Sequence, residues 1–307
     1  MSNTHVSTST PSFDALSAQI AGYSLNTQAQ IQKSQARHRL NLVREWKIPI
    51  GSRVLEIGCG EGDCTVALAY AVGDKGTVVA VDPSRPNSGF PVNLATRHRF
   101  ISEGPLGPRI TWVEKTALEY LSSLSRFPDG SAKLFDVAVL SHSLWYFESP
   151  QEIIATLEAL RQYCNRLHIA EWSLSTSDPA AQPHILAALT RAALDCHKPL
   201  NMMTNRMALD PQRIMELANE AGWRLQSDAI LTNLDPRLPH AALEVNYCLS
   251  RAFYKEICAH VSDARKRAAV LAVRDACEVS WQAVPDGVRG VKPMDVWVGT
   301  LYDGKKS

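Results

Sequence analysis

Three glycines at alternate positions and one acidic residue form the strongest chemical pattern in the sequence. Residues 54–62 read Val-Leu-Glu-Ile-Gly-Cys-Gly-Glu-Gly, so Gly58, Gly60 and Gly62 directly follow a short apolar run. A backbone without Cβ atoms turns tightly and lets a ligand approach the main chain. A helix that begins after such a turn offers free N–H groups to a carboxylate. Glu56, two residues before the first glycine, can attract an ammonium group. The pattern therefore favours an amino-acid-like ligand.

The spacing of the glycines and a second acidic residue narrow the choice of ligand. The fingerprint of nicotinamide-dependent enzymes, GxGxxG, needs a glycine at position 63, where this sequence has Asp63. Asp82 follows the apolar run Thr77 to Val81, and at a neighbouring strand tip it can accept both ribose hydroxyl hydrogens. Nicotinamide-dependent enzymes also carry an acidic residue at this position, so Asp82 alone does not distinguish a nicotinamide cofactor from an amino-acid-like ligand with a ribose. The other interpretation of Asp82 is a turn or cap residue beside Pro83.

Alternating strands and helices surround these residues. Because helices separate the expected strands, the strands pair in parallel through right-handed crossovers. The predicted fold is α/β, a doubly wound, mostly parallel seven-stranded sheet with helices on both faces. The expected strands are 53–57, 77–81, 110–113, 135–140, 167–170, 224–231 and 294–301. The expected helices are 28–48, 64–72, 93–102, 117–124, 151–164, 183–196 and 211–221, followed by a mostly helical block at 239–283.

The domain organisation is predicted from the positions where the alternation of strands and helices stops. Residues 1–12 are rich in Ser and Thr and are predicted to be a disordered tail. Residues 13–307 are expected to form one domain. Helical segments at about 176–210 and 236–290 exceed the minimal fold and are predicted to be insertions that form a lid.

Composition limits the classes of function. The chain has 307 residues and a formal net charge of +1, which gives no sign of nucleic-acid binding. Seven cysteines without a CxxC pair predict reduced thiols in a cytoplasmic protein and no metal site. The N-terminus has no apolar signal segment, and no apolar run is long enough to cross a membrane.

In these motifs the sequence resembles class I S-adenosylmethionine-dependent methyltransferases. The stretch LEIGCGEG resembles the first motif of that family and VVAVDPS the second. The resemblance covers about residues 30–172, with a weaker match through 231 and at the last strand. It implies S-adenosylmethionine as the cofactor. The cofactor-binding residues that it implies are Glu56, Gly58, Cys59, Gly60, Asp82, Pro83, Thr116, Ala117, Ser141 and His142.

Single positions refine this resemblance. Glu56, Gly58 and Gly60 are expected at the methionine end of the cofactor, and Asp82 at the ribose. Thr116 stands where the family often has an Asp that binds the adenine amino group; the alternative is that Thr116 only caps the following helix. Two aromatic residues after the fourth strand, Trp145 and Tyr146, are expected either in the wall around the sulfonium or in ordinary core packing.

The candidate catalytic residues are His142, Tyr146 and Glu171. Methyl transfer needs in-line alignment and exclusion of water, and a base only where the acceptor must lose a proton. His142 is the first choice for that base, because the motif places it near the methyl group. His184 and His197 are further candidates. Arg191 and Arg206 are candidate anchors for an acidic substrate.

The preferred hypothesis for the reaction is methyl transfer to a small organic molecule. The alternatives are a protein or RNA methyltransferase, or a non-catalytic S-adenosylmethionine-binding regulatory protein. The basic run 265–267 is interpreted as a solvated helix face. Met202, Met203 and Met207 are expected in the core or in an adaptable pocket. An apolar face is predicted to pack on the core or to form a homodimer; its residues are Leu243, Tyr247, Phe253, Tyr254, Ile257 and Val261.

Overall fold

A computed structural model describes residues 12–25, 28–89, 92–124, 134–199 and 207–304. Within these ranges seven strands form one sheet. The strands are β1 (Arg53–Ile57), β2 (Thr77–Asp82), β3 (Ile110–Glu114), β4 (Val137–Ser141), β5 (Arg166–Trp172), β6 (Trp223–Leu231) and β7 (Val296–Asp303). The α-helices are α1 (Phe13–Ala21), α2 (Ala29–Trp46), α3 (Asp63–Ala71), α4 (Leu94–Glu103), α5 (Ala117–Ser123), α6 (Pro150–Leu160), α7 (Gln182–Asp195), α8 (Pro211–Glu220), α9 (Pro239–Leu249), α10 (Arg251–His260) and α11 (Ala264–Gln282).

The strand order places the ends of β1, β2 and β4 side by side. The sheet runs β3-β2-β1-β4-β5-β7-β6, with all neighbours parallel except β7, which is antiparallel to β5 and β6. The order reverses between β1 and β4, and ligands of open α/β sheets bind beyond the carboxyl ends of the strands at such a point. The predicted α/β, mostly parallel seven-stranded sheet is confirmed. The antiparallel insertion of β7 was not part of the prediction.

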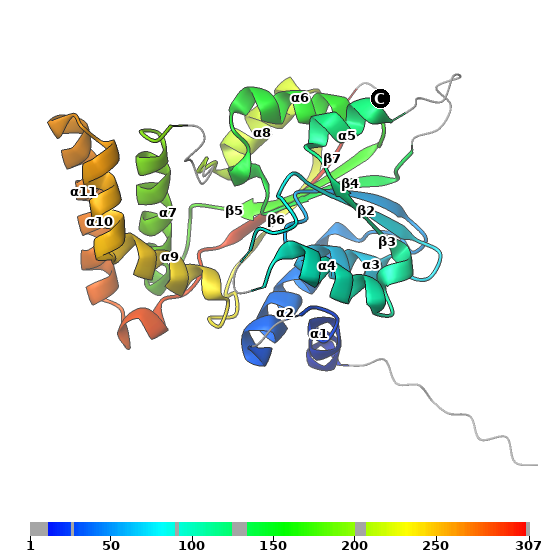
Figure 1. The fold of residues 1–307 in the computed structure, drawn as a ribbon, viewed down its shortest axis with the longest axis horizontal. Helices are drawn as coiled ribbons and strands as arrows, with labels where there is room; N and C mark the ends of the chain where they lie inside the picture. The colour runs from blue at the N-terminus through cyan, green and yellow to red at the C-terminus, as the bar shows by residue number, and fades with distance from the viewer. Residues whose placement is uncertain (1–11, 26–27, 90–91, 125–133, 200–206, 305–307) are drawn as a thin grey trace, which may run out of the picture.

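Helices cover both faces of the sheet and also extend beyond it (Figure 1). Helices α2, α3 and α4 lie on one face, and α5, α6 and α8 on the other. Helices α7, α9, α10 and α11 gather beside the sheet, where α7 packs against α9 and α11. The last group falls in the two predicted insertions, whose role as separate additions to the domain stays a prediction.

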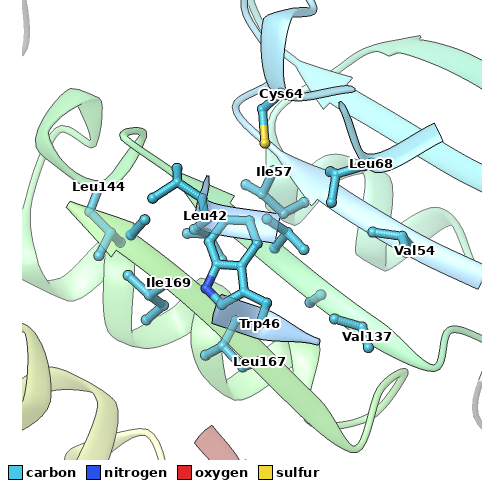
Figure 2. Packing of buried hydrophobic residues seen from close by; sticks show 14 of the residues in the cluster. Leu42, Trp46, Val54, Ile57, Cys64, Leu68, Val137, Leu144, Leu167 and Ile169 are labelled. Atoms are coloured by element: carbon cyan, nitrogen blue, oxygen red, sulfur yellow. The ribbon is translucent and has the colours of Figure 1, made fainter. Parts of the chain in front are cut away.

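The main core lies between α2, α3 and the sheet. Leu42 and Trp46 of α2 point onto the strands that carry Val54, Leu167 and Ile169, as Figure 2 shows, and Leu42 and Trp46 are 0% and 3% exposed. Full burial of a large apolar side chain contributes about 1.5–3 kcal/mol. This packing fixes α2 on the face of the sheet, so that Arg39, about two turns before Trp46, reaches Ser141 at the end of β4.

A second apolar cluster joins the helices beside the sheet. Phe253, Ile257 and Val261 are buried there, and Tyr247 packs against them. Leu243 and Tyr254 of the same predicted face are 63% and 45% exposed, so the face is only partly buried. Packing in the core is thus correct for the buried part of this face, and its use in a homodimer stays a prediction. Leu243 also lines the cavity described below.

Several predictions of elements need correction or lie outside the described ranges. Helix α1 was not predicted. Predicted strand 135–140 begins two residues later, and predicted strand 294–301 is shifted by two residues, because pairing with neighbouring strands sets the ends. The tail at 1–11, Met202, Met203 and Arg206 lie outside the described residues. Among the described helices, none is both long and apolar enough to cross a membrane.

Candidate active site

A cavity of about 680 Å³ opens at the point where the strand order reverses. The ends of β1, β2 and β4 form its floor, and α2, η2 (Leu144–Tyr146) and α9 form its sides. All ten residues predicted to bind the cofactor line this one cavity. Tyr146 also lines it, whereas Glu171 does not. Lining residues that the sequence had not indicated include Gln35, Arg39, Phe147, Glu152, Pro239 and His240.

The glycine turn after β1 shapes the floor of the cavity. Gly58, Gly60 and Gly62 all have positive φ angles, of 79°, 49° and 91°. A Cβ at Gly58 would lie 2.4 Å from Cβ of Ser143, so only glycine fits beneath the β4 loop. A Cβ at Gly60 would meet no atom within 4 Å and would project into open space. The turn thus exposes bare backbone to the cavity, as close approach of a ligand requires.

Glu56 brings a buried carboxyl group to the tip of β1. It is 1% exposed, and its Oε2 accepts a hydrogen bond of 2.5 Å from the Thr65 hydroxyl. Its Oε1 is buried without a hydrogen-bond partner among the described residues. Burial raises the pKa of Glu56 to about 7, against the lowering effect of Thr65 and Arg39. An oxygen that lacks a donor, in a cavity wall, fits a ligand that brings an ammonium group.

Asp82 ends β2 with both carboxylate oxygens held in place. Oδ2 accepts from the Gly60 amide at 2.8 Å, and Oδ1 accepts from the Ser84 amide at 2.9 Å. The turn interpretation of Asp82 is thus correct in geometry, yet the residue also lines the cavity. Each carboxylate oxygen accepts more than one hydrogen bond, so the two backbone contacts leave capacity for two ribose hydroxyls.

Thr116 caps helix α5 and also lines the cavity, while its contact with adenine stays a prediction. Its hydroxyl accepts from the Glu119 amide at 3.2 Å and donates to the Glu119 carboxylate at 2.9 Å, in a capping box that begins α5. Thr116 and Ala117 also line the cavity. Since the hydroxyl hydrogen is already donated, Thr116 can only accept a hydrogen bond from an adenine amino group.

Helix α2 supplies a cation that the sequence did not single out. Arg39 lines the cavity, and its Nη1 donates to Oγ of Ser141 at 2.9 Å. Ser141 ends β4 and is buried. The guanidinium is close enough to Glu56 to lower the pKa of that carboxyl group. The Glu56 carboxyl group and the Arg39 guanidinium are thus held near one another on the same wall of the cavity.

His142 adopts a left-handed backbone conformation and turns its ring nitrogens into the protein. Its φ is 54°, and its amide donates to the Ala170 carbonyl at 2.8 Å. Nδ1 lies 3.3 Å from Oε1 of Glu171, and Nε2 lies 2.8 Å from Nε2 of His38 on α2. In this arrangement both ring nitrogens face side chains of the protein that do not line the cavity, and Glu171 lies behind His142 instead of in the cavity wall.

Aromatic packing surrounds His142. Its ring centroid lies 4.6 Å from that of Trp172, which also packs against His38, His184 and His240. Among the described residues no group of three or more His, Cys, Asp or Glu side chains has the arrangement of a metal site.

Other candidate residues lie away from the cavity. Trp145 is 2% exposed and its Nε1 donates to the Leu209 carbonyl, so its predicted place in the cavity wall is wrong and core packing is correct. His184 is fully buried, and its Nδ1 accepts from the Met294 amide at 3.0 Å. His197 follows α7, and Arg191 lies over the Tyr247 ring, 5.1 Å from its centroid. None of these four residues lines the cavity.

Two cysteines lie in the wall, where burial raises the pKa of the Cys59 and Cys64 thiols far above the usual range. Neutral thiols are poor nucleophiles, so neither residue fits covalent catalysis.

Comparison with known proteins agrees with this geometry. A family model described as a methyltransferase domain matches residues 27–227. The chain belongs to this methyltransferase family. It is an S-adenosylmethionine-dependent methyltransferase, and S-adenosylmethionine is its cofactor. The match ends within β6, so α9, α10, α11 and β7 lie beyond the matched range.

Relatives are similar over most of this methyltransferase. Methyltransferases phomM and phomM′ of Diaporthe leptostromiformis are each 28% identical over 288 residues, which cover 82% of this chain and 74% of the relative. A cyclopropane-fatty-acyl-phospholipid synthase-like protein from Lactobacillus casei has a similar structure, with a TM-score of 0.77 and 25% identity. The alignment covers 93% of this chain and 98% of that protein.

Proposed function

We propose that this enzyme methylates a small organic molecule and binds S-adenosylmethionine in the cavity at the ends of β1, β2 and β4. The observation that carries the cofactor assignment is the buried Glu56 carboxyl group, whose Oε1 has no hydrogen-bond partner in the described part of the chain and lies beside a turn of bare glycine backbone. In this proposal Glu56 binds the ammonium group and Asp82 the ribose hydroxyls. Thr116, Ala117 and Pro83 lie at the adenine.

Arg39 completes the amino-acid end of the proposed cofactor site. A methionine group carries a carboxylate as well as an ammonium group, and a guanidinium pairs with carboxylates through several N–H donors. Arg39 lies on the same wall as Glu56 and is oriented by Ser141. Gly58, Cys59 and Gly60 add the backbone of the turn to this end.

The acceptor end of the cavity is proposed to lie between η2 and α9. Tyr146 and Leu243 line the cavity from these two elements and remain 50% and 63% exposed. Half-exposed apolar surfaces at a cavity mouth favour an organic acceptor with an apolar or aromatic part. His240 also lines this end, from the same helix as Leu243.

The protein itself needs to form no covalent bond during methyl transfer. S-adenosylmethionine supplies an activated methyl group, because its leaving group is a neutral thioether. The chain binds the two ends of the cofactor, orients the acceptor and excludes water. Where the acceptor carries a proton that must leave, we propose Tyr146 and His240 as candidate bases, because both side chains are titratable and line that end, whereas the nitrogens of His142 are engaged by His38 and Glu171.

Radiolabelled S-adenosylmethionine tests the substrate class. The protein and the labelled cofactor are incubated in three separate reactions. One contains a small-molecule extract of the source cells, one an RNA fraction and one a protein fraction. An Asp82→Ala variant serves as the control. Label in small organic products supports the proposal, and label only in RNA or protein overturns it. Cofactor binding with no label in any fraction would instead indicate a non-catalytic protein.

A further inference from the structure

Three buried side chains from three different elements form a continuous hydrogen-bonded array behind the cavity. His38 of α2, His142 after β4 and Glu171 of β5 are connected by distances of 2.8 Å and 3.3 Å. Glu171 is 1% exposed and His38 is 4% exposed. Of the three, only His142 lines the cavity. The array joins α2 to β5 through His142, which lies directly after β4.

The distances select one arrangement of hydrogens. Oε1 of Glu171 accepts from the Trp172 amide at 3.0 Å, and an ionised carboxylate has no hydrogen to donate to Nδ1 of His142. Nδ1 of His142 therefore carries the hydrogen that points to Glu171. In a neutral ring Nε2 is then an acceptor, and Nε2 of His38 must donate to it. Nδ1 of His38, which has no partner among the described residues, is the unprotonated nitrogen.

The surroundings oppose a positive charge on His142. Arg39 and His38 face it from α2, His184 faces it from α7 and His240 from α9. Burial, reinforced by these neighbours, holds the pKa of His142 well below its usual value. Burial likewise lowers the pKa of His38.

Two carboxyl groups favour a positive charge on the histidines of this region. They are Glu171 beside His142, and Glu244 of α9, whose Oε2 lies 3.8 Å from Nε2 of His184. Because Glu171 already accepts a hydrogen from the neutral ring, a second proton on His142 would have to displace the N–H of His38 from Nε2.

We propose that His38 and Glu171 act as positioning residues that keep His142 an uncharged wall of a cavity that binds a cation. The inference rests on the function proposed above, because the cation is the sulfonium of S-adenosylmethionine. A protonated imidazole in that wall would repel the sulfonium, whereas a neutral one does not. The array thereby keeps the preference for the charged cofactor over its neutral product, S-adenosylhomocysteine, constant with pH.

Nitrogen NMR of histidine-labelled protein tests the array without any methyl acceptor. In the free protein, Nδ1 of His142 is expected to resonate as a protonated nitrogen and Nε2 as an unprotonated one. Both signals are expected to stay constant between pH 8 and pH 5.5. A ring that titrates in this range, or one with its hydrogen on Nε2, would overturn the proposal. This result is obtained even if S-adenosylmethionine does not bind, so it separates failure of the array from failure of the proposed function.

Calorimetric affinities for S-adenosylmethionine and S-adenosylhomocysteine test the consequence. The ratio of the two affinities isolates the sulfonium charge, since the two molecules share their remaining binding groups. In the wild type the ratio is expected to be the same at pH 8 and pH 6. In His38→Phe, which keeps a ring but removes the donor, His142 becomes free to gain a proton. The ratio is then expected to fall by up to about fourfold from pH 8 to pH 6, because S-adenosylmethionine must bind the fraction of molecules with a neutral His142 and an ordinary histidine has a pKa of about 6.5.

Two further variants separate positioning from packing. His38→Gln keeps an N–H donor and is expected to restore a ratio that does not change with pH. His168→Gln, which changes a buried histidine outside the cavity, is the matched control and is expected to behave as the wild type. An unchanged ratio in His38→Phe would contradict the role of the array. If His38→Phe does not fold, the NMR experiment on the wild type still decides.

Discussion

Glu56 is expected to lose a proton when S-adenosylmethionine binds, and this loss is measurable. Burial raises the pKa of this carboxyl group to about 7 in the cofactor-free protein. At pH 7 about half of the molecules therefore carry the protonated carboxyl group. An ammonium group placed beside Oε1 favours the ionised form and returns the pKa of Glu56 toward its ordinary range. Binding and proton release are thus linked.

The size of the release follows from the pKa. Complete ionisation on binding releases about 0.9 proton at pH 6, about 0.5 at pH 7 and about 0.1 at pH 8. Substitution by Gln removes this proton and the charge-assisted hydrogen bond. Glu56→Gln is therefore expected to weaken cofactor binding by about 1.5–3 kcal/mol, the scale of a hydrogen bond to a charged group.

Titration calorimetry in two buffers with different ionisation enthalpies counts the released protons. At pH 6 the difference between wild type and Glu56→Gln isolates this residue, because an α-amino group, with an ordinary pKa of about 7.7–8.0, is already protonated there before binding. Glu61→Gln is the matched control, since Glu61 also lines the cavity but lies beyond the strand tip. Equal proton release in the wild type and Glu56→Gln at pH 6 would refute the assignment of Glu56 to the ammonium group.

Four further substitutions, one of them a control, test separate parts of the account. Asp82→Ala is expected to weaken cofactor binding by about 1.5–3 kcal/mol in calorimetry, because both ribose contacts and the hydrogen bond to the Gly60 amide are lost, and an unchanged affinity would refute the ribose assignment. Gly58→Ala is expected to abolish binding and to lower the free energy of unfolding in urea, because its Cβ would lie 2.4 Å from Cβ of Ser143. Gly51→Ala also has a positive φ but meets no atom, so it should cost only about 1 kcal/mol of stability and leave binding intact. Burial lowers the pKa of His168 to about 3, so its unfolded form binds a proton below pH 6.5 that the folded form does not. Wild-type stability should fall by about 1.3 kcal/mol more than that of His168→Gln between pH 7 and pH 5.5, and equal slopes of unfolding free energy against pH would contradict this burial.

The floor of the candidate site is predictable from the sequence because local chemistry determines it. The glycine turn requires positive φ angles, and an apolar run before it requires a buried strand, so Gly58, Gly60 and Glu56 can be placed without tertiary information. Asp82 follows in the same way from the next strand. Parallel pairing then brings both strand tips to one edge of the sheet.

The side walls of the cavity are not predictable in this way. His38 and Arg39 lie in a helix rich in Gln, Lys and Arg, where a polar residue at a buried position looks like any residue of the exposed face. Only the packing of Trp46 on the sheet settles which side of α2 faces the strands. The inward turn of the His142 nitrogens depends on partners 104 and 29 residues away in sequence. Helix α1 has only nine residues, and it is positioned by contacts with α2.

A crystal structure of the complex with S-adenosylhomocysteine tests the central claim most directly. We expect the amino-acid end of the ligand between Glu56 and Arg39, its ribose hydroxyls on Asp82 and its adenine beside Thr116 and Pro83. A ligand bound elsewhere on the chain, or bound in this cavity with its ribose away from Asp82, would contradict the account.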